Sequence, residues 1–169
     1  MDAKTYVKKQ IASARRTADG VLEGLTDEQV NWAPPGTANA IGVTLVHMLT
    51  SEDAFVQAVL QGKPLVWASG GWAGRIGISA PPGRGAGWDE VKSARLSAAT
   101  LKEYRQAVQA ATDAYLGRLT DEDLDCEVTM MGGTRQVADA LTMVAAHTLE
   151  HSGEIAALKG VQGSKGLPY

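Results

Sequence analysis

Residues 135–159, RQVADALTMVAAHTLEHSGEIAALK, contain the pattern on which the fold assignment rests. Apolar residues recur in this stretch at spacings of three and four, as they do along one face of an α-helix. His147 and His151 lie within the pattern, one turn apart and about 40° from each other around the helix axis. The same face carries Ala140, Met143, Val144, Ile155 and Leu158. We therefore expect both imidazoles to point into the protein interior.

Three further segments show helical periodicity. We expect helices over about 3–25, from a cap at Thr37 or Asn39 to about residue 62, and over about 97–119. The helix over 135–159 is expected to start after a cap at Thr134 and to end at Gly160. Only residues 126–131 look extended, so no set of strands is predicted. Four amphipathic helices of about twenty residues predict an all-α four-helix bundle, in one domain covering residues 1–169.

Residues 62–96 form a long irregular crossover between the second and third predicted helices. The segment is rich in glycine and contains Trp67, Trp72 and Trp88. Large aromatic side chains bury themselves where they can, so we expect an ordered segment whose tryptophans pack on the helices. Lining a substrate pocket is the alternative role for them. Arg75 and Arg84 either bind an anionic cosubstrate or face solvent.

The composition excludes several classes of protein. The chain has 169 residues, 44% of them hydrophobic and 21% charged, with a formal net charge of −3. It has no basic cluster of the kind that binds nucleic acid, and no apolar run of about 18 residues that would span a membrane. The first residues, Met1 to Lys4, lack the charged start, apolar middle and cleavage site of a signal peptide, so we expect none, and the single cysteine, Cys126, can form no internal disulfide. These features predict a cytoplasmic protein with no nucleic-acid or membrane partner and an inert Cys126.

The chain contains three histidines, and the third, His47, lies in the middle of the second predicted helix. Its face carries the mostly small residues Ala40, Val43, Ser51, Ala54 and Ala58. Space beside His47 would let it join His147 and His151 around one divalent ion, with positions left open for water or substrate. Three protein ligands with an open position are typical of catalytic metal sites. The spacing alone leaves a second interpretation open, in which the histidines are hydrogen-bonded core residues.

Carboxylates near these histidines are the candidate partners. Glu154 lies about 20° from His147 around the helix and is our candidate catalytic residue. It could accept a hydrogen bond from an imidazole N–H, shuttle protons or act as a fourth ligand; the alternative is a solvated carboxylate at a helix end. Glu52 and Glu150 lie at the edges of the histidine faces, where we expect structural roles.

Five stretches of the chain resemble the DinB-like superfamily and its branch of metal-dependent thiol S-transferases. They are LTDEQVNW (25–32), PPGTAN (34–39), IGVTLVHM (41–48), HTLEHSGEI (147–155) and KGLPY (165–169). The resemblance implies that His47, His147 and His151 are the metal triad, with zinc or nickel as the ion. It also implies an up-up-down-down bundle, a homodimer, and a low-molecular-weight thiol such as mycothiol, bacillithiol or glutathione.

Two functions follow from these observations, and the sequence leaves open whether the protein is an enzyme. One is a metal-dependent transferase, or a hydrolase-like enzyme, that activates a thiol or water for reaction with a small-molecule substrate. The other is a non-catalytic metal-binding or stress-associated helical protein. The residues alone leave zinc, nickel, copper and iron open, because imidazole suits all four.

Overall fold

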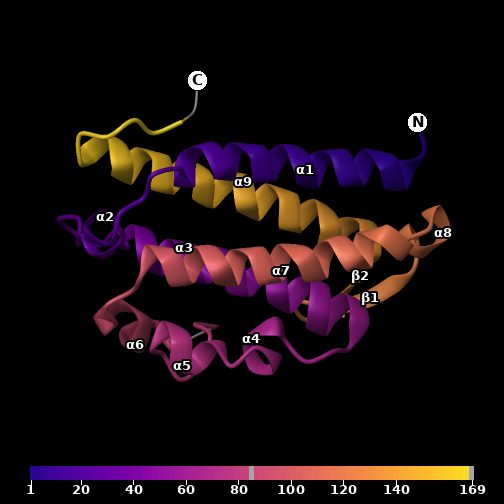
Figure 1. Ribbon diagram of the computed structural model, residues 1–169. Helices are drawn as coiled ribbons and strands as arrows, with labels where there is room; N and C mark the ends of the chain where they lie inside the picture. Colours follow the sequence, from indigo (N-terminus) through magenta and orange to yellow (C-terminus); the bar gives the residue numbers. More distant parts are fainter. Residues whose placement is uncertain (84–85, 168–169) are drawn as a thin grey trace.

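The computed structural model describes residues 1–83 and 86–167, and the fold is mostly helical (Figure 1). Four long helical segments lie side by side: α1 (Ala3–Leu22), α3 (Ile41–Asp53) with its π-helical continuation η1 (Ala54–Val59), α7 (Ala98–Arg118) and α9 (Val137–Val161). Shorter helices are α2 (Asp27–Asn31), α4 (Val66–Ser69), α5 (Trp72–Ile76), α6 (Trp88–Ser93) and α8 (Asp121–Leu124). Strands β1 (Glu127–Met130) and β2 (Gly133–Gln136) form an antiparallel pair.

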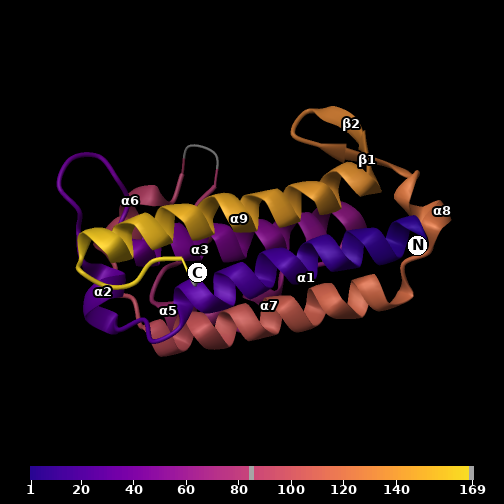
Figure 2. The same ribbon diagram turned by 90° about the horizontal axis from the view of Figure 1, so that it is seen from above.

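The directions of the long helices differ from the expected order. Helices α1 and α9 run the same way, because the Nζ of Lys159 near the end of α9 donates to the carbonyl of Val21 near the end of α1 (2.7 Å). Helix α7 runs opposite to α1, since the backbone N–H of Lys4 donates to Asp121, just beyond the end of α7 (2.7 Å). Figures 1 and 2 show α3 parallel to α7. The up-up-down-down prediction is therefore wrong, and the order is up-down-down-up.

The connections explain this order. The segment 23–40 stays at one end of the molecule and contains α2, so α3 starts where α1 ends (Figure 1). The crossover between η1 and α7 returns the chain to that same end, which makes α3 and α7 parallel. A long crossover was predicted, but it contains α4, α5 and α6 rather than only irregular chain.

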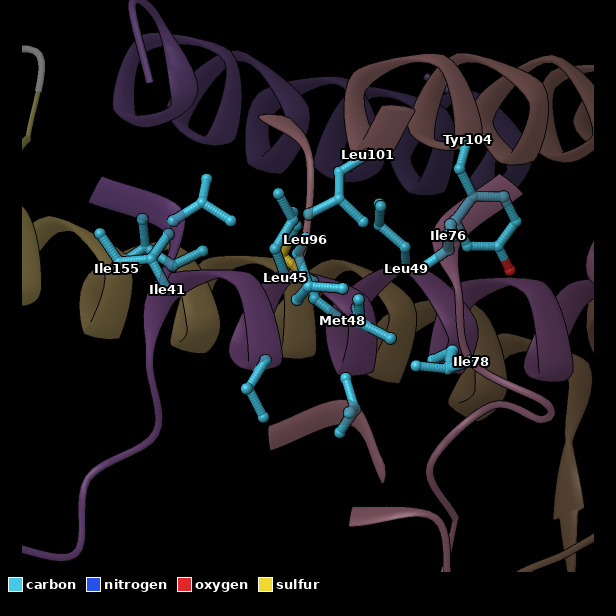
Figure 3. Packing of buried hydrophobic residues seen from close by; sticks show 14 of the residues in the cluster. Ile41, Leu45, Met48, Leu49, Ile76, Ile78, Leu96, Leu101, Tyr104 and Ile155 are labelled. Atoms are coloured by element: carbon cyan, nitrogen blue, oxygen red, sulfur yellow. The ribbon is translucent and has the colours of Figure 1, made fainter. Parts of the chain in front are cut away.

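Helix α3 lies at the centre of the core and is buried along nearly all of its length. Figure 3 shows side chains from α7 (Leu101), α9 (Ile155) and the crossover (Ile76, Ile78) gathered around it. At Gly42 the neighbours approach so closely that an added Cβ would lie 2.6 Å from the side chain of Val30. A second apolar cluster joins α1, α7 and α9 at the other end.

Two tryptophans and a buried carboxylate hold the crossover against the core. Trp67 and Trp72 are each 4% exposed, and their rings lie 5.5 and 5.1 Å from the ring of Tyr104. The carboxylate of Asp53, at the end of α3, is 0% exposed and accepts three hydrogen bonds. The donors are the N–H groups of Val66 and Trp67 and the hydroxyl of Tyr104, each at 2.9 Å. The prediction that tryptophans bury the crossover is confirmed for these two.

The start of the last long helix differs from the sequence-based expectation. Thr134 does not cap this helix, because it lies in β2 and pairs with Thr129 across the hairpin. Met131 (φ 54°) and Gly132 (φ 81°) form the two-residue turn, which requires positive φ at both positions. The cap of α9 is Gln136, so the helix starts at Val137.

Two other helix starts also differ from expectation. Helix α3 starts after Ala40, whose side chain makes no capping bond, and not after a cap at Thr37 or Asn39. The stretch after the first helix contains α2, which Thr26 and Gln29 start with a reciprocal capping box. Among the described residues, no helix is both long and apolar enough to cross a membrane.

Candidate metal centre

The three histidines come together between α3 and α9. The Nε2 atom of His147 lies 3.2 Å from that of His47 and 2.9 Å from that of His151. One nitrogen of each ring lies within 4.8 Å of the other two. Two nitrogens bound at 2.0–2.1 Å to one tetrahedral ion are about 3.3 Å apart, close to the observed separations. The three side chains can therefore hold a divalent metal ion.

Hydrogen bonding alone satisfies this cluster poorly. The Nε2 of a neutral imidazole carries either one proton or one in-plane lone pair. The Nε2 of His147 touches two other ring nitrogens, so it can make a good hydrogen bond to only one of them. A shared ion, by contrast, accepts a lone pair from each ring. The donor set thus fits a metal better than it fits a hydrogen-bonded core cluster.

The environment keeps two of the rings in the neutral form that binds metals. Burial, with smaller contributions from positive charge on His151 and His47, lowers the pKa of His147 to about 4. Burial also lowers the pKa of His47, with a second contribution from His151 and a smaller opposing one from Glu154. All three side chains are half-buried, so solvent reaches the cluster.

Glu154 orients one of the rings. Its carboxylate lies 2.7 Å from the Nδ1 of His151, one turn further along α9. An Nδ1–H donated to this carboxylate leaves the Nε2 lone pair of His151 free for an ion, a common arrangement around metal-binding histidines. By contrast, the buried Nδ1 of His47 has no hydrogen-bond partner among the described residues.

Among the described residues, the other predicted candidates make no hydrogen bond or ion pair with the histidines. Glu52 is buried and accepts from Arg15 and Thr112, both at 2.8 Å, so its role is structural, as expected. Glu150 is exposed. Arg75 forms an ion pair with Glu103 and lies over the ring of Trp72. Arg84 lies outside the described residues, and Cys126 is exposed on the connection before β1.

One neighbour of the cluster was not singled out by the sequence. The ring of Trp88, at the start of α6, lies 5.1 Å from the ring of His47. The sequence offered three crossover tryptophans without a signal to separate them, because the path of the crossover decides which one reaches α3. A cleft of about 780 Å³ lies elsewhere, between the end of α1 and the start of α7, and no histidine lines it.

Comparison with known families now adds to this geometry. The model of the DinB superfamily matches residues 10–155, which include all three histidines. The chain belongs to the DinB superfamily. The resemblance seen in the sequence is thus confirmed. A comparison with curated proteins gave no match.

Solved structures with the same fold include DinB-like proteins. A conserved protein from Enterococcus faecalis aligns with a TM-score of 0.81 at 18% identity, over 97% of this chain and 99% of the other. A DinB-like protein from Bacillus cereus aligns with a TM-score of 0.66 at 16% identity, over 95% of this chain and 93% of the other. A DinB-like protein from Bacillus subtilis aligns with a TM-score of 0.62 at 18% identity, over 97% of this chain and 96% of the other. At these identities the likeness concerns the fold.

Proposed function

We propose that this DinB-superfamily protein binds one divalent metal ion, zinc or nickel, through His47, His147 and His151. The observation that carries the proposal is the convergence of three Nε2 atoms at separations close to those around a single ion. The burial of His47 and His147 supports it, because lowered pKa values keep these rings neutral at physiological pH.

We further propose that the site serves a metal-dependent transferase that activates a low-molecular-weight thiol, or water. A divalent ion held by three neutral imidazoles supplies a charge of +2 that lowers the pKa of a coordinated thiol or water. The chain's own residues orient the site: Glu154 fixes the ring of His151, and α3 and α9 hold the imidazoles from two sides. In this proposal Glu154 positions the metal ligand His151 by accepting a hydrogen bond from its Nδ1–H.

The arrangement of the core supports a functional ion over a purely structural one. Neither apolar cluster contains a histidine, and together the two clusters include residues from all four long helices. The fold therefore has a core that does not depend on the site. A structural ion would instead contribute much of the folding free energy. We also propose that the protein forms a homodimer and is located in the cytoplasm.

Elemental analysis of the purified protein tests the metal site. We expect about one equivalent of zinc or nickel per wild-type chain and a large loss in His147→Ala. Thr142→Ala, an exposed position on the same helix, is the matched control and should keep the metal. Equal metal content in wild type and His147→Ala would contradict the proposed ligands.

Chelation separates the transferase from a non-catalytic metal-binding protein. Thiol cosubstrates are screened against the metal-loaded and chelated forms, and circular dichroism is recorded on both. We expect turnover only in the loaded form, with the helical signal kept after chelation. Full turnover of metal-free protein would contradict the transferase proposal, and unfolding on chelation would indicate a structural ion.

A further inference from the structure

Trp88 is the aromatic neighbour of the histidine cluster and contacts it at His47. The rings of His147 and His151 meet His47 edge-on, at interplanar angles of 71° and 81°. The indole lies 5.1 Å from the same ring with a tilt of 50°. Trp88 is half-buried, so part of its surface stays open beside the site. No other tryptophan, tyrosine or phenylalanine of the described chain makes a ring contact with the histidines.

Several local features hold this indole in place. Its Nε1–H donates to the carbonyl of Gly83 at 2.9 Å, and Gly83 pairs with Ala86 in an isolated bridge. Gly87 has φ of 81°, and a Cβ there would lie 3.1 Å from Pro82, so a residue with a side chain is strained at this position. Val91, 0% exposed, anchors α6 in the core. The indole is therefore pre-organised.

We infer that Trp88 is a specificity-determining residue, the aromatic wall against which a flat, aromatic substituent of a metal-bound thiol packs. The inference rests on the proposed function, because the metal brings the thiol to the site. Aromatic pairs gain stability beyond their buried area, which corresponds to a preference of about 2- to 12-fold. An indole fixed in advance loses little conformational freedom on binding.

Cobalt-loaded protein provides the test. Benzyl mercaptan and 2-mercaptoethanol are titrated into wild type, Trp88→Ala, Trp88→Phe and Trp32→Ala, and thiolate binding is followed by its charge-transfer absorption. Trp32 is the control, because it is also half-buried and has no recorded ring contact with a histidine. We expect the ratio of the two affinities to fall about 2- to 12-fold in Trp88→Ala, to change less in Trp88→Phe, and to stay constant in Trp32→Ala.

The outcomes distinguish this inference from the proposal beneath it. Wild type that binds no cobalt would refute the metal site itself. Cobalt binding with the same affinity ratio in wild type and Trp88→Ala would overturn the inference alone. If Trp88→Ala fails to fold, the affinity ratio of Trp88→Phe still tests the inference, and fluorescence tests the placement of Trp88, since open-shell ions quench a nearby indole. Cobalt should quench less of the emission of Trp88→Phe than of Trp32→Phe, and equal quenching would refute the placement of Trp88.

Discussion

Replacing Asp53 by alanine should destabilise the protein more than truncation of Glu150 or Glu154, which are exposed. Its side chain is 0% exposed and accepts bonds from two backbone N–H groups of α4 and from the hydroxyl of Tyr104. Alanine leaves two buried donors, the N–H of Trp67 and the hydroxyl of Tyr104, and the half-buried N–H of Val66 without this acceptor. Each unsatisfied buried donor costs about 1–3 kcal/mol, so the two buried donors predict a loss of about 2–6 kcal/mol in the free energy of unfolding. Total stabilities of about 5–15 kcal/mol make this a large fraction.

The charge itself contributes less than the bonds. Burial raises the pKa of Asp53 despite its three donors, so the ionised form is penalised in the fold. Asparagine keeps one acceptor oxygen and removes that penalty, but its NH2 group would face one of the two backbone donors, so Asp53→Asn should lose less than Asp53→Ala but more than an exposed substitution. Tyr104→Phe removes one bond to a charged group and should cost about 1.5–3 kcal/mol.

Urea unfolding of the metal-free protein, followed by circular dichroism, measures these differences. Glu150→Ala is the control, because this carboxylate is exposed and its removal should change stability by about 0.5 kcal/mol or less. The double variant of Asp53 and Tyr104 should lose less than the sum of the single losses, since both share one bond. A loss below about 1 kcal/mol in Asp53→Ala would refute the view that this carboxylate anchors the crossover.

Three more predictions concern other parts of the molecule. Gly42→Ala should cost about 1–3 kcal/mol in urea unfolding because of its close neighbours, whereas Gly153→Ala, with open space around it, should be neutral or stabilising. Lys159→Met removes the buried donor to the end of α1 and should cost about 1–3 kcal/mol, against little change in exposed Lys102→Met. The pKa of His147, lowered from 6.5 to about 4, means that the unfolded chain binds more protons between these values. The free energy of unfolding of the metal-free protein should thus increase by about 2 kcal/mol as pH rises through this window. In His147→Gln the free energy of unfolding should depend less on pH.

The long helices were predictable because each shows a helical repeat, but their directions were not. A repeat identifies a face and carries no information on which end of one helix meets which end of another. The directions depend on paired contacts far apart in sequence, such as Lys159 with Val21. The short connection that contains α2 could have indicated that α1 and α3 are antiparallel.

The hairpin before α9 was missed because its signals are weak. Only four residues on each side pair, and the turn is Met-Gly rather than the common Asn-Gly or Asp-Gly. Thr134 was interpreted as a cap because threonine serves both roles, in strands and at helix starts. Pairing with Thr129 across the hairpin decides for the strand.

In the candidate metal centre, spacing predicted that His147 and His151 share a helix face, and left open whether they bind a metal. The small neighbours of His47 and the family resemblance added His47 to the predicted site. Glu154 was predicted as an acceptor for an imidazole N–H, a proton shuttle or a fourth ligand, and the structure places its carboxylate 2.7 Å from the Nδ1 of His151. Trp88 could not be selected, because its contact with His47 depends on the three-dimensional path of the crossover.

The buried polar groups of α3 differ in how completely they are satisfied. A helix buried on every side must supply a partner for each polar side chain it carries into the core. The two acids of α3 find hydrogen-bond donors on other elements. Glu52 accepts from side chains of α1 and α7, and Asp53 accepts from α4 and α7. The polar contact of His47 is with the imidazole of His147, and its Nδ1 has no partner in the described chain. The Nε2 of His47 faces the imidazole of His147 and its Nδ1 lies on the other side of the ring, so the histidine cluster is the part of this core whose polar groups are not all satisfied within the described chain.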